Sequence, residues 1–272
     1  MIQEHMPGSE LREVAAIRLE IKVINLASAK ERRVWMERQL AGLDVPWSFF
    51  EAHTSLQCPA LRFDPGAVRK TYGRDLTGPQ VALWSSHYAV LLDFVQTGSS
   101  DYLMVLEDDV QLDSAFPMDR LLERCAAEDI HYMRLYGMYH RAARQLSYFY
   151  DRAIIRYHTT PSGTQAYIVS KEGARRILDT CQQVDTAWDL ALDEFWKTGL
   201  PLYSIYPFPV LERFSPSSVP INEIVPLNLR DRLGFFVTRV GKVLRKKGGS
   251  WRLRGRDRQM RARGQGFEQV GI

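Results

Sequence analysis

Residues Tyr102–Asp109 read YLMVLEDD, in which five apolar residues are followed by three carboxylates. An unbroken apolar run of this length is typical of a strand buried on both faces, as in the centre of an α/β sheet. Three adjacent carboxylates repel one another, and ionising all of them at the end of a buried strand is costly without a cation. Ligands of open α/β sheets bind at the carboxyl ends of the strands. The stretch therefore predicts a central strand whose end holds Mg²⁺ or Mn²⁺, since both ions prefer oxygen ligands. The alternative is a turn of solvated acidic residues.

The chain before this stretch alternates between strand and helix patterns. Leu19–Leu26 and Trp47–Ala52 are apolar-rich strand candidates. Between them, Ser28 and Glu31 form a capping-box pattern, which predicts a helix that ends before Gly42. A strand, a helix and a strand of this length predict two parallel strands joined by a crossover.

The same alternation continues along the chain. A second capping box, formed by Thr77 and Gln80, predicts a helix that ends at Gly98 and leads into the strand at Tyr102. The later strand candidates are His131–Tyr136, Ala166–Ser170 and Leu202–Tyr206, and the later helix candidates are Glu172–Cys181 and Thr186–Lys197. Such alternation predicts a single α/β domain over residues 19–228, preceded by a leader of residues 1–18.

The composition excludes several other classes of protein. The 272 residues are 45% hydrophobic and 25% charged, which rules out a disordered, collagen-like or disulfide-scaffold chain. No apolar run reaches 18 residues, and the first 20 residues carry charges where a signal peptide needs an apolar stretch, so we expect no secretory route. The three cysteines, Cys58, Cys125 and Cys181, are odd in number and far apart, which fits a reducing cytoplasm.

The last part of the chain differs from the rest in charge. Residues 230–272 hold 13 Lys and Arg against three Asp and Glu, whereas the preceding residues carry a net charge of −6. Apolar residues recur there at steps of three and four, which predicts an amphipathic helix interrupted at Gly248-Gly249. The apolar positions are Leu229, Leu233, Phe236, Val240 and Val243.

A basic amphipathic helix of this kind lies in the interface of an anionic membrane. We therefore expect residues 229–272 to form a basic tail, and the protein to be cytoplasmic and peripheral on the inner face of the cell membrane. The alternatives are a disordered basic end and a helix packed on the domain. The Arg-rich stretch Ser250–Arg263 has Trp251 as its sole aromatic residue, so we expect no nucleic-acid partner, although nucleic-acid binding through the arginines is a competing function.

Four stretches between about residues 20 and 220 resemble, in order, the motifs of glycosyltransferase family 25, which includes lipooligosaccharide and collagen galactosyltransferases. The matching stretches are Val23–Leu26 with Glu31–Arg33, Leu76–Thr77 with Ser86–His87, Val105–Val110, and Gly163–Ser170 with Gly173–Ala174. The chain departs from the family pattern at Gln80, Ala82 and Leu83, and at His53–Ser55.

The resemblance implies a GT-A-type, Rossmann-like domain that binds a nucleotide sugar. It further implies an inverting hexosyltransferase that moves galactose or a similar hexose from a UDP-sugar to a glycan acceptor. The acceptor would be lipooligosaccharide or another cell-surface glycan, free or lipid-linked. Bound Mn²⁺ or Mg²⁺ would offset the charge of the diphosphate leaving group. A non-catalytic relative that retains nucleotide-sugar binding is the alternative.

The resemblance also implies roles within the acidic triplet. By analogy, Asp109 binds the metal, Asp108 binds the metal or the donor ribose, and Glu107 supports them. Alternation along a strand would instead place Glu107 and Asp109 on one side.

Four further residues are implied to bind the donor. Asn25 ends the first strand, where the uracil or ribose would lie. Arg32 and Arg33 follow in the first turn of a helix, whose amino end favours anions, although a solvated helix face is equally compatible with them. His87 shares an apolar helix face, so it is either a donor-binding residue or a hydrogen-bonded core histidine.

An inverting transferase needs a general base on the acceptor hydroxyl, and this base is normally a carboxylate. Asp185 follows the Gly-Ala helix at the position that resembles the family motif, so it is the first candidate base, and Asp189 is the second. Asp185 suits a helix cap nearly as well.

Overall fold

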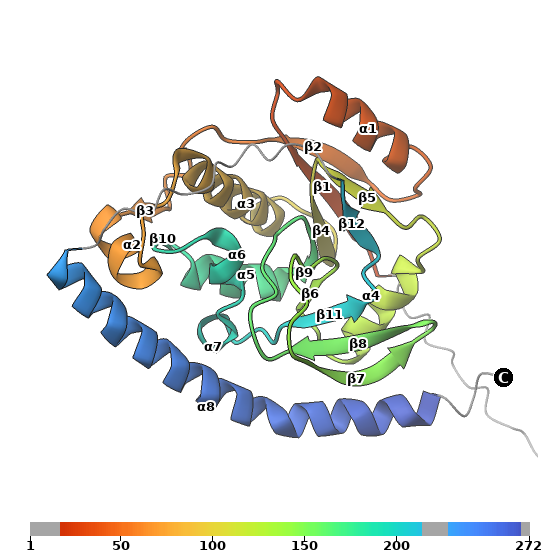
Figure 1. Ribbon diagram of the computed structural model, residues 1–272. Helices are drawn as coiled ribbons and strands as arrows, with labels where there is room; N and C mark the ends of the chain where they lie inside the picture. The colour runs from red at the N-terminus through yellow and green to blue at the C-terminus, as the bar shows by residue number, and fades with distance from the viewer. Residues whose placement is uncertain (1–16, 214–227, 268–272) are drawn as a thin grey trace, which may run out of the picture.

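The computed structural model describes residues 17–213 and 228–267, and its centre is an eight-stranded mixed sheet (Figure 1). The strand order is β2-β1-β4-β9-β6-β11-β8-β7. The bounds are β1 Leu19–Asn25, β2 Trp47–Glu51, β4 Tyr102–Glu107, β6 Tyr132–Arg134, β7 Ala143–Phe149, β8 Arg152–Tyr157, β9 Ala166–Ser170 and β11 Tyr203–Tyr206. Strands β2, β1 and β4 are parallel, whereas β9 runs antiparallel to β4 and β6.

Strand β4 is buried on both faces, as its apolar run predicts. Tyr102, Met104 and Leu106 belong to one hydrophobic core, and Leu103 and Val105 belong to the other. Because successive side chains of a strand point to opposite faces, a continuous apolar run is required only where both faces are covered.

Helices cover both faces of the sheet. On one face lie α1 (Lys30–Leu40) and α4 (Met118–Ala127). On the other face lie α3 (Gly78–Gln96), α5 (Lys171–Thr180), α6 (Trp188–Leu192) and α7 (Phe195–Thr198). Two small sheets and one further helix complete the domain: β3 (Arg62–Phe63) with β10 (Gln183–Val184), β5 (Val110–Leu112) with β12 (Val210–Glu212), and α2 (Pro65–Tyr72).

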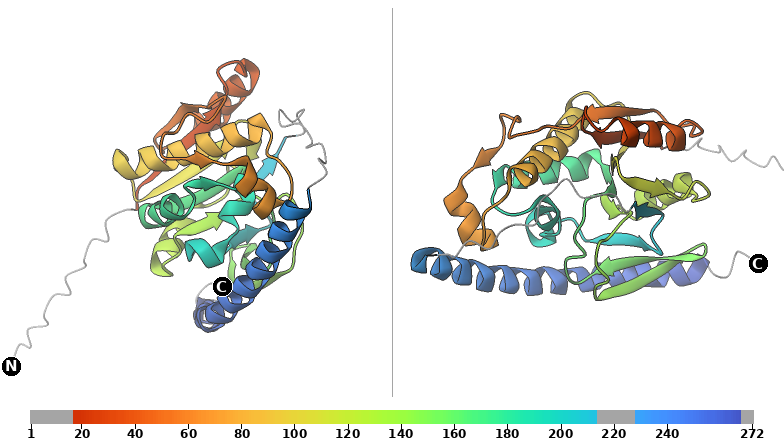
Figure 2. Two further views of the ribbon diagram at one scale, coloured as in Figure 1. Left: turned by 90° about the vertical axis from the view of Figure 1, so that its left-hand side faces the viewer. Right: turned by 45° about the horizontal axis from the view of Figure 1, so that its top comes forward.

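The last helix, α8 (Leu229–Phe267), runs along the outside of the domain (Figures 1 and 2). It contacts α2, α7 and β7, which are distant from one another in the sequence. Asp257 of α8 is fully buried against Arg156 of β8, with Arg156 Nε and Nη2 donating to its two oxygens at 2.7 and 2.6 Å. Near the other end, Arg69 Nε of α2 lies 3.2 Å from Asp231 Oδ2. The helix is therefore packed on the domain rather than detached from it.

The predicted break at Gly248-Gly249 is wrong, because α8 continues through both residues. A Cβ atom at Gly249 would lie 2.9 Å from a ring carbon of Phe195, so this glycine permits α8 to approach α7 closely. A Cβ atom at Gly248 would meet nothing within 4 Å. Gly249 is therefore required for close packing against α7, whereas no neighbour of Gly248 requires a glycine there.

Several local predictions are confirmed. Strands β1 and β2 are parallel, with Ile21 opposite Trp47. The capping box of α3 forms as expected: Thr77 Oγ1 accepts from Gln80 N (3.4 Å), and Gln80 Oε1 accepts from Thr77 N (2.9 Å).

Other local predictions are wrong. The Ser28 capping box does not form, because α1 begins at Lys30 and no side chain caps it. The single helix predicted over Thr186–Lys197 is divided into α6 and α7, since the chain turns at Asp193. The patterns also gave no indication of α2, of α4 or of the β7–β8 hairpin. Most of the expected leader, residues 1–16, lies outside the described residues.

Candidate active site

A cavity of about 340 Å³ lies at the carboxyl ends of β1, β2 and β4. Strand β9 runs in the opposite direction, so the segment before it, Gly163–Gln165, reaches the same edge of the sheet. The polar residues that line the cavity are Arg32, Gln80, Glu107, Asp108, Asp109, Thr164, Gln165, Asp189 and Glu212. The cavity thus lies where the strand ends predicted a ligand, with the acidic triplet in its wall.

The three carboxylates of the triplet do not all point the same way. Glu107, the last residue of β4, accepts a hydrogen bond from Thr164 Oγ1 at 2.6 Å. Asp108 accepts from Asn25 Nδ2 at 2.7 Å and lies 2.9 Å from Arg32 Nη1. The same Arg32 nitrogen lies 3.4 Å from Asp109 Oδ2. Asp108 and Asp109 therefore face Arg32 together, and Glu107 does not join Asp109, because the strand ends at Glu107 and a turn follows.

The close carboxylates shift one another's proton affinity. Burial, together with the neighbouring charges of Glu107 and Asp108, raises the pKa of Asp109 to about 7. Burial also raises the pKa of Asp108, against the effects of Asn25 and Arg32. Burial would raise the pKa of Glu107 too, but His87 and Thr164 outweigh it and the pKa is lowered. The single positive charge of Arg32 is thus insufficient to keep Glu107, Asp108 and Asp109 ionised together.

Two buried polar atoms of cavity-lining residues have no hydrogen-bond partner among the residues that the structure describes. They are Asp109 Oδ1 and Gln165 Oε1, and the buried Asn25 Oδ1 behind them is also unpartnered. An unpaired buried polar atom costs free energy unless a ligand or water satisfies it. These atoms therefore favour a polar ligand in the cavity.

The carboxylates fit a divalent cation that is shared with a substrate. Within the described residues, no group of three or more His, Cys, Asp and Glu side chains is placed to hold a metal alone. Mg²⁺ is commonly bound through one or two carboxylates together with substrate phosphates. Asp108 and Asp109 match that arrangement, and Asp109 Oδ1 is the unpartnered oxygen.

The two candidate bases lie in different surroundings. Asp189, the second candidate, lines the cavity, and its Oδ2 accepts from Gly163 N at 3.2 Å. Asp185, the first candidate, is absent from the cavity wall, and its Oδ2 lies 3.9 Å from Lys197 Nζ. Burial raises the pKa of Asp185. The structure therefore brings Asp189, and not Asp185, to the acidic triplet.

Three predicted donor-binding residues do not line the cavity, and the buried Asn25 is one of them. Arg33 lies over the Phe49 ring, 4.1 Å from its centroid, and pairs with Glu37 at 3.5 Å. It thus occupies a solvated helix face. His87 is fully buried, stacked near the rings of Tyr167 and Trp188, and its Nε2 lies 3.7 Å from Glu107. It is a core histidine that contacts the site through Glu107.

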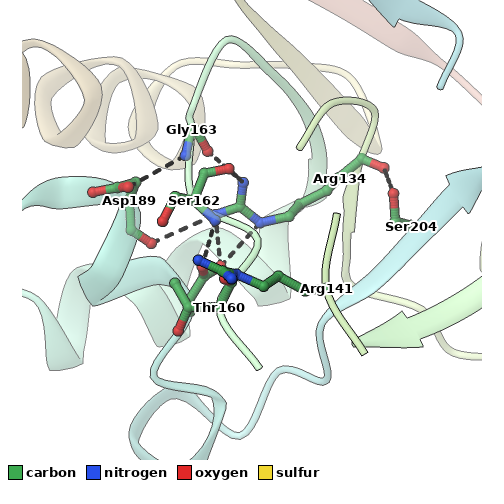
Figure 3. A network of polar contacts seen from close by, with 8 residues as sticks. Arg134, Arg141, Thr160, Ser162, Gly163, Asp189 and Ser204 are labelled. Atoms are coloured by element: carbon green, nitrogen blue, oxygen red, sulfur yellow. Dashed lines mark hydrogen bonds and ion pairs between the residues drawn. The ribbon is translucent and has the colours of Figure 1, made fainter. Parts of the chain in front are cut away.

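A buried arginine that the sequence analysis missed organises the part of the cavity wall formed by Gly163–Gln165 (Figure 3). Arg134 of β6 donates from Nη1 to the carbonyl oxygens of Ser162 (3.2 Å) and Gly163, and from Nε and Nη2 to Asp193 Oδ1 at 2.9 and 2.6 Å. Ser162 and Gly163 both have positive φ, 59° and 82°, a conformation that is strained for serine. The network therefore fixes the segment that lines the cavity. The only sequence signal was a charged residue inside an apolar strand candidate.

The chain matches known proteins over most of its length. Residues 19–196 match the family model described as glycosyltransferase family 25 (LPS biosynthesis protein). "Lacto-N-neotetraose biosynthesis glycosyltransferase LgtE" of Neisseria gonorrhoeae is 30% identical over 203 residues, which are 68% of this chain and 71% of the relative. LgtB of the same organism, with the same descriptive name, is 30% identical over 58% of this chain and 59% of its own length.

More distant matches extend to an animal protein and to solved structures. "Probable inactive glycosyltransferase 25 family member 3" of Bos taurus is 26% identical over 58% of this chain and 28% of its own length. Protein A197 from STIV has 11% identity and a TM-score of 0.39, and covers 78% of this chain and 98% of its own. A glycosyltransferase involved in glycosylation of the PBCV-1 major capsid has 12% identity and a TM-score of 0.32, over 58% of this chain and 62% of its own.

Proposed function

Since the chain belongs to glycosyltransferase family 25, we propose that it transfers galactose or a similar hexose from a UDP-sugar to a glycan acceptor. The observation that carries this proposal is one cavity bordered by the Glu107–Asp109 triplet, by Arg32 and by Asp189. The Neisseria relatives are named for lacto-N-neotetraose biosynthesis, which supports lipooligosaccharide or another cell-surface glycan as the acceptor. We also assign the domain to the GT-A type, because this is the fold that membership of family 25 implies.

The donor occupies the strand-end side of the cavity. Its diphosphate lies near Asp108, Asp109 and Arg32, where the amino end of α1 adds favourable backbone dipoles. The ribose or uracil lies toward the carboxyl end of β1, where Asn25 is buried behind the residues that line the cavity. Asp108 and Asp109 would hold Mg²⁺ or Mn²⁺ together with the donor, and the ion would offset the charge of the diphosphate. Arg32 supports the same diphosphate as the bond to the sugar breaks.

Asp189 is the general base. Its carboxylate takes the proton of the acceptor hydroxyl while that oxygen forms a bond to C1 of the donor sugar. The C1–O bond to the diphosphate breaks, the electron pair leaves with UDP, and the configuration at C1 inverts. The hydrogen bond from Gly163 N to Asp189 Oδ2 orients the carboxylate, which leaves Oδ1 for the acceptor.

Release of UDP tests this function without knowledge of the acceptor. The purified protein is incubated with UDP-galactose, UDP-glucose, UDP-N-acetylglucosamine and GDP-mannose, with Mn²⁺ or with EDTA. We expect slow hydrolysis of a UDP-hexose that requires Mn²⁺. Binding of UDP without hydrolysis or transfer would favour the second candidate, a non-catalytic relative, which the similarity to the bovine protein supports.

We also propose that α8 holds the enzyme at an anionic membrane surface in the cytoplasm. The apolar residues predicted to share a face are all exposed, with Leu233 and Phe236 each 65% exposed. Lys242 pairs with Glu194 and Arg261 donates to Gln145 O, but the basic residues of α8 that do not bind the domain contribute roughly 1 kcal/mol each near an anionic surface. No helix within the described ranges is long and apolar enough to cross a membrane.

Co-sedimentation with liposomes tests the membrane proposal. We expect the intact chain to bind vesicles of phosphatidylglycerol, less at high salt, and the double variant Leu233→Glu with Phe236→Glu to lose binding. A matched control carries Tyr148→Glu and Tyr150→Glu, which add the same charge at exposed positions on the β7–β8 hairpin. Equal binding by all three proteins would contradict the assignment.

A further inference from the structure

A row of aromatic rings leads from the cavity to the surface. Tyr136 lies 6.0 Å from Phe208, Phe208 lies 5.5 Å from Tyr206, and Tyr206 lies 6.3 Å from His140, measured between ring centroids. We name these four residues the aromatic strip. Tyr136 is buried at its inner end, whereas Tyr206 is 43% exposed and His140 is exposed at its outer end.

The inner end of the strip joins the cavity wall. The Tyr136 hydroxyl donates to Glu212 Oε2 at 2.6 Å, and Glu212 lines the cavity. Met138 lines the cavity as well, two residues before His140 in the same turn. The strip therefore adjoins the candidate active site, and the two meet at Glu212 and Met138.

The strip is held in place by the backbone around it. Met138 N donates to Ser162 O at 3.2 Å and Tyr139 N donates to Pro161 O at 3.0 Å, which fastens the turn to the segment that Arg134 fixes. A Cβ atom at Gly137 would lie 3.0 Å from the Phe208 ring, so that the turn packs directly on the strip. A surface fixed in this way loses little freedom when a ligand binds.

We propose that the aromatic strip binds the acceptor as a neutral pyranose, which stacks its C–H face on Tyr206. This inference rests on the proposed transferase function and identifies where its acceptor lies. One face of a hexopyranose carries C–H groups, and an exposed aromatic ring removes them from water. The hydroxyls around the ring edge remain free for polar partners, and Glu212 is one such partner at the end of the cavity next to the strip. An acceptor that lies on the strip extends its reactive hydroxyl into the cavity, where the donor and Asp189 meet.

Saturation-transfer NMR on the full chain tests the strip directly. The probes are methyl β-galactoside, methyl β-glucoside and lactose, each with and without UDP. We expect transfer to the ring C–H protons of at least one sugar, retained by Tyr206→Phe and lost in Tyr206→Leu. The leucine keeps apolar bulk without a ring, so folding is preserved and checked by circular dichroism. Tyr150→Leu is the matched control, since Tyr150 is 67% exposed on the β7–β8 hairpin.

Steady-state kinetics give a second readout. With the best sugar as acceptor, Tyr206→Leu should raise the acceptor KM about five- to tenfold, the size expected for one aromatic contact. Mn²⁺-dependent UDP release without acceptor should not change. Loss of both activities in Tyr206→Leu would overturn an acceptor-specific role.

The proposed acceptor site and the proposed transferase function can be disproved independently of each other. UDP affinity, measured by calorimetry, reports on the donor site alone. If UDP binds but no sugar receives saturation from the wild type, or Tyr206→Leu leaves the transfer unchanged, the strip is not the acceptor site. If sugars bind through Tyr206 but UDP does not bind, the strip stands as a sugar site and the transferase function fails. Loss of liposome binding in Tyr206→Leu without an effect on sugars would assign the strip to a membrane instead.

Discussion

At the residue scale, a single guanidinium faces two adjacent carboxylates. Arg32 Nη1 lies 2.9 Å from Asp108 and 3.4 Å from Asp109, so one positive charge is shared between them. The pKa of Asp109 stays raised to about 7 in spite of Arg32, because burial and its acidic neighbours disfavour the ionised form. A further cation beside Asp109 therefore gains more than it would beside an isolated carboxylate.

Because of this shortage of positive charge, we expect a divalent cation to contribute most to donor binding through Asp109. We expect Asp109→Asn to weaken Mn²⁺-dependent UDP binding by several kcal/mol, since it removes an anionic ligand while keeping the side-chain shape. Calorimetry with and without EDTA measures the change. Asp119→Asn, an exposed carboxylate on α4, is the control. Metal-independent UDP affinity in the wild type would contradict the metal assignment.

The two candidate bases provide a matched pair of substitutions. Asp189→Asn should lower kcat by roughly 10²–10⁴-fold, because the acceptor hydroxyl loses its base. Asp185→Asn should leave kcat close to wild type, since Asp185 faces Lys197 outside the cavity. Single-turnover kinetics at saturating acceptor separate this effect from donor binding. A large effect from Asp185→Asn alone would reverse the assignment.

At the scale of helices and strands, sequence patterns correctly predicted those helix ends and strands that depend on residues close together in the chain. The Thr77 box formed because both of its partners lie within one turn, and the run at Tyr102 formed a central strand because its composition matches burial on both faces. The Ser28 box has an equivalent pattern of Ser and Glu, but α1 begins two residues beyond Ser28.

What the sequence could not predict depends on contacts between distant segments. Arg134 meets Asp193 59 positions later, and this buried pair divides one expected helix into α6 and α7. The position of the triplet at the cavity could be predicted because it ends a strand, whereas which of Asp185 and Asp189 lies there depends on how the short helix α6 is turned toward the cavity.

The contact between α8 and α7 gives a test at this scale. Gly249→Leu should destabilise the protein by about 1–3 kcal/mol, because its side chain must displace Phe195 and Trp196. Gly248→Leu, one residue earlier, faces open space and should stabilise the protein by about 0.5–1 kcal/mol through helix propensity. Urea unfolding of both variants measures the difference. Equal effects would mean that α8 does not pack closely on α7.

At the scale of the whole molecule, α8 is fastened to the domain by a fully buried ion pair. Asp257→Ala leaves Arg156 buried without its partner, which should cost about 3–5 kcal/mol. Asp119→Ala removes an exposed partner of Arg120 and should cost less than about 1 kcal/mol. Urea unfolding compares the two. A small effect from Asp257→Ala would show that α8 contributes little to the folded domain.

The pairing of Arg156 with Asp257 also bears on how the chain is made. The two residues are 101 positions apart, so at about 5–20 residues per second the ribosome adds Asp257 roughly 5–20 s after Arg156. Throughout that interval the arginine has no counter-ion from α8, and the edge of the sheet formed by β8 and β7 lacks the helix that packs against it. Packing of α8 against β7 and β8 therefore waits until Asp257 has left the ribosome, and a nascent chain arrested before Asp257 should remain sensitive to protease in the β7–β8 hairpin.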